Sequence, residues 1–366
     1  MIQTACIHFS GDKPCRFRRL CDGCSHFEPF EKATKVLVIK CRAQGDVLRT
    51  TALLPGLKRR YPESFISWLV DEESVDLLDN NPHIARVHPF NLDGVLPIQA
   101  QAYDVLISLD KEPGLISLAS MVHAGRKFGF GMNAHGNLEV FNPGAGYALR
   151  LGIDDDLKFR KNQKTYQEIV AEAAEIDYRG DEYVFDLRDE HRRGAQAFFK
   201  KNGISPGSPN IGLNTGAGAK FETKQWPEQH YLRLIRDLRT KLKANVFLLG
   251  GKRETGLNRR LADGSRAKVF DTGNDNSLLE FAGLVSMLDL VVTSDTLGMH
   301  IAIALKKKVV ALFGPTCPQE IDLYGRGVKL FQGAGCSPCY KQTCPDPVCM
   351  KGITPERVFE EIQKLI

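Results

Sequence analysis

Residues 289–318 read DLVVTSDTLGMHIAIALKKKVVALFGPTCP. The apolar, β-branched run at the start predicts a buried strand (289–295), and a short helix follows at 298–306. A second apolar run, KVVALFG (308–314), predicts a further strand. A strand, a helix and another strand in so short a stretch are typical of a parallel α/β sheet.

The same alternation runs through the rest of the chain. Further strands are expected at 35–40, 65–70, 85–90, 103–109, 210–216 and 245–251, and helices at 75–80, 230–242 and 277–288. The stretch 47–62 suits a helix that turns Val47, Leu48, Leu54 and Leu57 to one side. HAGRKFGF (123–130) carries loop signals instead.

This pattern predicts two Rossmann-like α/β domains that face a cleft and join near 188–209. Four segments are expected: a cysteine-rich leader (1–32), an N-terminal domain (33–190), a C-terminal domain (206–350) and a final helix (354–366) with a Thr cap before Pro. A chain of 366 residues is too long for one ordinary core and fits two domains.

Composition and charge limit the partners. No run reaches the roughly 18 uncharged apolar residues of a membrane span, and the first fifteen residues lack the apolar run of a secretory signal, so a cytoplasmic protein is expected. From Lys13 to Arg60, twelve Lys and Arg accompany four Asp and Glu. This bias favours an anionic partner (phosphate, a membrane surface or nucleic acid), or it marks a solvated basic face.

The first polar loop, Gln44-Gly45-Asp46, follows the strand at 35–40. Asp46 has two interpretations. It caps the next helix, as Asp often does, or it presents a carboxylate in the cleft that takes a proton from an acceptor hydroxyl. Both roles are compatible.

Two loops in the second half are suited to phosphate. In NTGAGAKFETKQWP (214–227), the small residues at 215–219, Thr215 and Gly216 among them, let the backbone approach an anion, and Lys220 and Lys224 add positive charge. The alternative is an ordinary glycine-rich connection, because the loop lacks the P-loop pattern. In SDTLGMH (294–300), Asp295, Thr296 and Gly298 open a helix, where an anion is favoured, and His300 lies in its first turn.

These stretches resemble glycosyltransferase family 9, the ADP-heptose:lipopolysaccharide heptosyltransferases, over roughly residues 35–366. The resemblance implies a GT-B fold, inversion at the anomeric carbon and no catalytic metal. It assigns Asp46 as the base, Lys224 as the donor-phosphate lysine and Glu254 as the acid that holds the nucleoside. The loop Asp295–His300 is then the diphosphate clasp, although Leu297-Gly298 departs from the earlier glycine of many relatives.

The ten cysteines are clustered. Cys6, Cys15, Cys21 and Cys24 have the spacing C-x8-C-x5-C-x2-C, and Cys336, Cys339, Cys344 and Cys349 have C-x2-C-x4-C-x4-C. Four thiolates at such spacing suit a structural zinc or iron ion, in either set or shared between them. The alternative is reduced thiols without metal.

The predicted function is therefore transfer of a heptose or similar sugar from an ADP-sugar to an anionic lipopolysaccharide-type acceptor, with peripheral contact to the inner membrane. A related transferase with another nucleotide sugar or a protein acceptor is the nearest alternative. A nucleic-acid-binding zinc protein is an alternative of another class. It is disfavoured because the leader is short and lacks aromatic residues at stacking spacing, so no nucleic-acid partner is expected.

Overall fold

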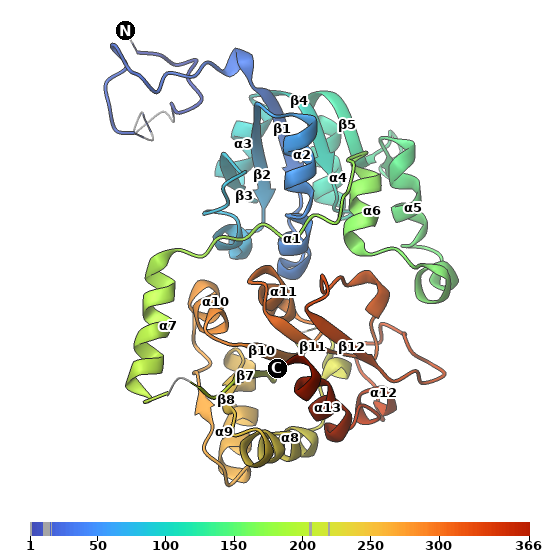
Figure 1. The fold of residues 1–366 in the computed structure, drawn as a ribbon. Coiled ribbons are helices and arrows are strands. Elements are labelled where there is room, and N and C mark those ends of the chain that lie inside the picture. The colour runs from blue at the N-terminus through green and yellow to red at the C-terminus, as the bar shows by residue number, and fades with distance from the viewer. Residues whose placement is uncertain (1, 10–14, 16, 205–206, 219) are drawn as a thin grey trace.

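The computed structural model describes residues 2–9, 15, 17–204, 207–218 and 220–366. Lys13 and Arg16 of the basic segment and Ala219 of the glycine-rich loop lie outside these ranges. The described residues form two six-stranded sheets, one in each half of the chain (Figure 1). No helix in this part of the chain is long and apolar enough to cross a membrane.

The first sheet has the strand order β3-β2-β1-β4-β5-β6, and only β5 and β6 pair in antiparallel fashion. Its strands are β1 (Thr34–Ile39), β2 (Ser64–Val70), β3 (Arg86–Pro89), β4 (Ala102–Ser108), β5 (His123–Met132) and β6 (Leu138–Val140). The α-helices of this half are α1 (Gln44–Thr50), α2 (Leu53–Arg60), α3 (Leu92–Gln99), α4 (Pro113–Met121), α5 (Gly146–Arg150) and α6 (Tyr166–Ala173).

The second sheet is parallel throughout, in the order β12-β11-β10-β7-β8-β9. Its strands are β7 (Asn210–Asn214), β8 (Asn245–Leu249), β9 (Phe270–Asp271), β10 (Leu290–Ser294), β11 (Lys308–Phe313) and β12 (Gly327–Phe331). The α-helices of this half are α7 (Asp189–Lys201), α8 (Glu228–Lys241), α9 (Thr255–Gly264), α10 (Leu278–Ser286), α11 (Leu297–Ala304), α12 (Val348–Lys351) and α13 (Pro355–Leu365).

Counted within each half, both sheets follow the order 3-2-1-4-5-6 of doubly wound nucleotide-binding folds. In such a sheet the loops after the first and fourth strands lead in opposite directions and leave a crevice at the carboxyl ends of the strands. These strands are β1 and β4 in the first half, and β7 and β10 in the second. Helices α1 and α11 begin at the two crevices and contact each other where the halves meet (Figure 1).

Three local expectations were wrong. The short helix expected at 75–80 is a 3-10 helix that spans Glu72–Leu77. The segment 123–130, expected as a loop, forms most of β5. Glycine at 129 allows this strand to approach β4 closely, because a Cβ there would lie 1.9 Å from the carbonyl oxygen of Ser108. The helix expected at 47–62 is split into α1 and α2, because a continuous helix would place the ring of Pro55 against the carbonyl of Thr51.

Most of the expected strands and the capped last helix are confirmed. The last four residues of β1 are buried, as a strand covered on both faces requires. Thr354 caps α13 by accepting a hydrogen bond from the Arg357 N–H. The stretch expected as the connection between the domains contains α7, which packs against α10 of the second half.

A buried ion pair supports the loop that leads to Asp46. Lys40, at the end of β1, bonds Asp110, which follows β4, and the same carboxylate accepts the backbone N–H of Cys41. Lys40 is 5% exposed and Asp110 3%. This pair therefore ties together the ends of two neighbouring strands, β1 and β4, whose loops diverge at the first crevice.

Candidate active site

Two cavities open where the halves meet. The first, the Glu254 cavity, has an empty volume of about 1000 Å³, part of it open to solvent. It is lined by Gln44, Asn214, Gly216, Gly218, Gly250, Gly251, Lys252, Arg253, Glu254, Asn276, Leu278, Phe281, Thr296, Leu297, Gly298 and Ile301. The second, the Asp46 cavity, has about 960 Å³ and is lined by Ala43, Gly45, Asp46, Arg49, Lys158, Lys220, Phe221, Lys224, Asp295, Thr296, Leu297, His300, Thr316, Cys317, Glu320, Ile321 and Tyr340. Thr296 and Leu297 line both, so the two cavities adjoin at the N-terminus of α11.

Every residue predicted for catalysis or donor binding, except Thr215, lines one of these cavities. The Thr215 side chain is fully buried, and its hydroxyl lies 3.0 Å from the Leu249 carbonyl oxygen and 2.6 Å from Asn258 Oδ1. Thr215 follows β7 directly and Leu249 ends β8. The Thr215 side chain therefore joins neighbouring strand ends and does not face a ligand.

Asp46 lies in the first turn of α1. The N-cap of this helix is Ala43, so the prediction that Asp46 caps it is wrong. The Asp46 carboxylate is 37% exposed and forms an ion pair with Arg49 at 2.9 Å. Burial alone would raise the pKa of Asp46, but the charges of Arg49 and Lys40 hold it below its ordinary value. At neutral pH Asp46 is therefore ionised and able to accept a proton.

The ion pair gives a pH prediction. If Asp46 must be ionised for turnover, Arg49→Gln raises its pKa, and the acid limb of kcat/KM moves to higher pH by about one unit. The wild-type enzyme loses activity only as pH falls through the depressed pKa, whereas the variant loses it earlier. The profile of Arg160→Gln, which alters a surface pair with Asp156, should match the wild type. If the acid limb of Arg49→Gln does not move, the ionisation of Asp46 does not determine the pH dependence of kcat/KM.

The N-terminus of α11 faces both cavities. Thr296 is its N-cap, and the side-chain amide of Asn214 donates to Thr296 Oγ1 and Thr293 Oγ1, both at 2.9 Å. A Cβ on Gly298 would lie 2.7 Å from that amide nitrogen, so this position requires glycine. A helix N-terminus presents free N–H groups and favours an anion.

Lys224 brings a positive charge to the same place. Its Nζ donates to the Asp295 carbonyl oxygen at 2.8 Å and to Asp295 Oδ2 at 3.0 Å. Burial alone would raise the pKa of Asp295, but the charge of Lys224 lowers it. Lys224 thus lies beside the first turn of α11, as a phosphate-binding lysine would.

His300 connects the two halves. Its ring is buried, with Nδ1 3.2 Å from the Tyr183 hydroxyl. It packs on Gly45, where a Cβ would lie 2.6 Å from His300 Cδ2. Burial and, after it, the charge of Arg49 lower the pKa of His300 to about 4, so the ring is neutral at pH 7. The glycine before Asp46 is therefore required by the contact between the halves.

Glu254 lies shortly after β8 and lines the Glu254 cavity. Its Oε2 accepts the Gly251 N–H at 2.8 Å, and a Cβ on Gly216 would lie 3.2 Å from its carboxyl carbon. The carboxylate thus closes one side of the cavity, where it can accept hydrogen bonds from sugar hydroxyls. Acids hold ribose at this position in other doubly wound sheets.

The Asp46 cavity contains a carboxylate that the sequence did not reveal. Burial raises the pKa of Glu320, although the charges of Arg49 and Lys158 oppose this effect. Of the three carboxylates of this cavity, Asp46 and Asp295 therefore have lowered pKa values and Glu320 a raised one. The lowered pKa keeps Asp46 ionised, so it can act as a base, whereas the pKa of Glu320 is shifted the other way.

The model of glycosyltransferase family 9 (heptosyltransferase) matches residues 97–349, more than half of the chain. This chain belongs to glycosyltransferase family 9. The resemblance predicted from the sequence is confirmed, and with it the class of enzyme: a glycosyltransferase.

Curated relatives of this family 9 chain are heptosyltransferases. Lipooligosaccharide heptosyltransferase 2 of Campylobacter jejuni is 30% identical over 168 residues, which cover 44% of this chain and 53% of that protein, so the match spans about half of the relative. Lipopolysaccharide heptosyltransferase 1 of Pseudomonas aeruginosa is 26% identical over 379 residues, with 91% of this chain and 98% of that protein covered.

Solved structures of family 9 share the fold. The family 9 glycosyl transferase of Veillonella parvula superposes with a TM-score of 0.72 at 19% identity, covering 91% of this chain and 97% of that one. The Escherichia coli heptosyltransferase WaaC with ADP gives a TM-score of 0.59 at 21% identity, covering 90% and 97%. The predicted GT-B fold of two Rossmann-like domains is confirmed.

The second cysteine set is dispersed in this family 9 enzyme. Cys336 and Cys344 are exposed, and Cys349 is buried in the core of the second half. Across the ranges that the structure describes, no three His, Cys, Asp or Glu side chains are placed to hold a metal ion. The arrangement gives no support to a metal site at residues 336–349.

Proposed function

We propose that this family 9 enzyme is an inverting heptosyltransferase: it moves a heptose or similar sugar from an ADP-sugar to a hydroxyl of a lipopolysaccharide-type acceptor, with Asp46 as general base. One observation carries the proposal: an ionised carboxylate at the crevice of one sheet shares a cavity with the anion-favouring N-terminus of α11 at the crevice of the other. Relatives named heptosyltransferases, and a fold shared with an ADP-bound one, support the donor and the sugar.

In this proposal the donor lies across both cavities. Glu254 and Gly216 receive the nucleoside, and Thr296 to Gly298 and Lys224 receive the diphosphate. The sugar then lies in the Asp46 cavity, beyond the N-terminus of α11. Small residues at 216 and 298 allow the close approach of a ligand to the backbone.

The transfer is a single displacement. The acceptor oxygen bonds to the anomeric carbon, the bond from that carbon to the diphosphate oxygen breaks, and the hydroxyl proton passes to Asp46. Attack from the face opposite the leaving group inverts the anomeric centre. Lys224 and the helix N-terminus stabilise the charge that develops on ADP, and no step is assigned to a metal.

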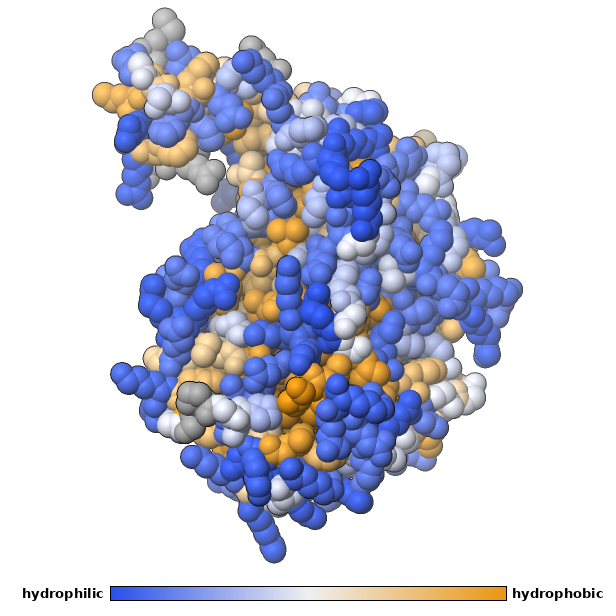
Figure 2. Space-filling view, viewed as in Figure 1, coloured by the Kyte–Doolittle hydropathy of each residue, from blue (hydrophilic) through white to orange (hydrophobic). Residues whose placement is uncertain are grey.

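The proposal includes an anionic acceptor and peripheral contact with a membrane. Arg49, Lys158 and Lys220 line the Asp46 cavity and suit an anionic glycan. In the cysteine-rich leader (1–32), here called the N-terminal extension, Ile2 and Leu20 are exposed, and Leu20 follows basic residues 18–19. Figure 2 shows apolar side chains among hydrophilic ones on this extension. Such a surface suits peripheral contact with an anionic bilayer, which co-sedimentation with anionic and neutral vesicles would test.

A thermal-shift panel tests the donor assignment. A ligand that binds only the folded state adds about 2.7 kcal/mol of stability at a hundred times its Kd. ADP and ADP-heptose should therefore raise the Tm more than UDP-, GDP- or CMP-sugars at equal concentration. A larger shift with another nucleotide sugar would favour the related transferase and reject the ADP-sugar donor.

Lys224→Ala should weaken ADP binding. A hydrogen bond to a charged group contributes roughly 1.5–3 kcal/mol, so the Kd should rise on the order of 10–150-fold. His300→Ala should have a smaller effect. Calorimetry measures both, with Lys241→Ala on the exposed surface of α8 as the control. An unchanged Kd in a folded Lys224→Ala variant would remove this lysine from the site.

A further inference from the structure

The N-terminal extension has no core of its own. Among its described residues, up to Pro29, only Cys6 is buried. The chain is nevertheless folded back on itself: the Ile7 N–H donates to the Glu28 carbonyl at 2.9 Å, and the Phe30 N–H donates to that of Ala5 at 2.9 Å. A unit this small buries too little apolar surface for stability and usually needs a disulfide or a metal ion.

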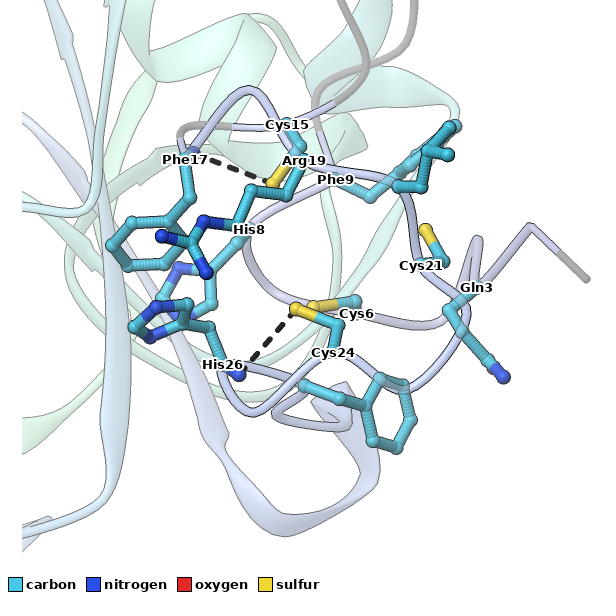
Figure 3. A pocket seen from close by; sticks show the side chains of 12 residues that line it. Gln3, Cys6, His8, Phe9, Cys15, Phe17, Arg19, Cys21, Cys24 and His26 are labelled. Atoms are coloured by element: carbon cyan, nitrogen blue, oxygen red, sulfur yellow. Dashed lines mark hydrogen bonds between the residues drawn. The ribbon is translucent and has the colours of Figure 1, made fainter.

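Four thiols from three stretches of this extension line one hollow (Figure 3). They are Cys6, Cys15, Cys21 and Cys24, and none forms a disulfide. Cys21 and Cys24 share a single turn, because the Cys24 N–H donates to the Cys21 carbonyl at 3.2 Å. A turn that carries C-x2-C is a common source of two metal ligands.

Backbone N–H groups donate hydrogen bonds to two of these sulfurs. The Phe17 N–H donates to Cys15 Sγ at 3.3 Å, and the His26 N–H donates to Cys24 Sγ at 3.4 Å. In both cases the donor lies two residues after the cysteine. Both sulfurs are therefore held by the backbone of their own loop.

The two nearby imidazoles have other partners. His8 Nε2 lies 3.3 Å from Glu28 Oε2, and the His26 ring stacks on Phe17 with centroids 4.1 Å apart. The thiols are therefore the better ligand set. As placed, no three of these groups are arranged to coordinate one ion, so metal binding requires the thiols to move closer together.

We propose that Cys6, Cys15, Cys21 and Cys24 bind one tetrahedral Zn²⁺ or Fe²⁺ ion, which crosslinks the N-terminal extension. Soft sulfur ligands select these metals, and four of them leave no open position, so the ion is structural. Because metal binding at such sites is coupled to folding, the ion closes the hollow and fixes the paired segments around residues 5–7 and 28–30.

Elemental analysis of the full chain, purified without oxygen and without added metal, tests this site. The wild type should carry about one more zinc or iron ion per chain than Cys21→Ser/Cys24→Ser. The matched variant Cys336→Ser/Cys344→Ser should keep the wild-type content. Hydrogen exchange at the Ile7 and Phe30 amides should quicken in the first variant only, while exchange in β1 and affinity for ADP stay unchanged.

Cobalt identifies the ligands. Co²⁺ added to the metal-free protein should give a sulfur-to-metal charge-transfer band and intense tetrahedral bands, lost in Cys21→Ser/Cys24→Ser. Folded wild-type protein with neither zinc nor iron and no cobalt spectrum would overturn the proposal. Equal metal content in the wild type and Cys21→Ser/Cys24→Ser would do so as well.

Discussion

Asp46→Asn is expected to lower kcat by about 10²–10⁴, because general-base catalysis contributes that factor. The substitution keeps the size of the side chain and removes its ability to accept the acceptor proton. Asp46 is not the cap of α1, so its structural role is limited to the partly exposed ion pair with Arg49. The Asn amide oxygen can still accept a hydrogen bond from Arg49, so the Tm and the Kd for ADP should change little.

Two further variants make this result specific. Asp156→Asn removes a carboxylate from a surface ion pair and should leave kcat unchanged. Glu320→Gln removes another carboxylate of the same cavity. If chemistry limits the rate and Asp46→Asn keeps more than about a tenth of the wild-type kcat, Asp46 is not the base. A large loss in Glu320→Gln alone would then assign the proton to Glu320.

Asp110→Ala is expected to reduce the free energy of unfolding by about 3–5 kcal/mol, because it leaves the Lys40 ammonium buried without its carboxylate. The loop that carries Asp46 should lose its support at the same time, so activity should fall with stability. Denaturant unfolding measures the first effect and kcat/KM the second.

The double variant Lys40→Met/Asp110→Val distinguishes the cost of an unpaired buried charge from the cost of lost side-chain packing. Replacing both charges by apolar groups is often close to neutral, so most of the lost stability should return. Glu361→Ala, which breaks a surface pair with Lys364, should cost less than about 1 kcal/mol. A cost that small for Asp110→Ala would show that the buried pair does not support the crevice.

Strong local patterns predicted much of the fold. β1, β10 and β11 are continuous apolar runs, and such runs are buried strands in parallel sheets. β5 was missed because its charged and glycine residues are typical of loops, while its strand pairing depends on β4. The break before α2 follows from Pro55 and was available in the sequence.

The candidate site also contains residues that the sequence could predict and residues that it could not. Asp46, Lys224 and Asp295 follow strands or open helices, so their place at the carboxyl edge could be inferred from position alone. Arg49 was within reach, since it lies three residues after Asp46 on the same helix. Glu320 and Lys158 could not be inferred, because only the folded chain brings residues so far apart in sequence to one cavity.

The most direct test of the proposed function is the stereochemistry of transfer from ADP-heptose. Wild-type enzyme, ADP-heptose and a heptose-deficient lipopolysaccharide acceptor should release one ADP for each sugar transferred. NMR of the product should show a glycosidic bond of anomeric configuration opposite to that of the donor. Retention of the donor configuration, or turnover only with a nucleotide sugar that does not carry ADP, would contradict the account.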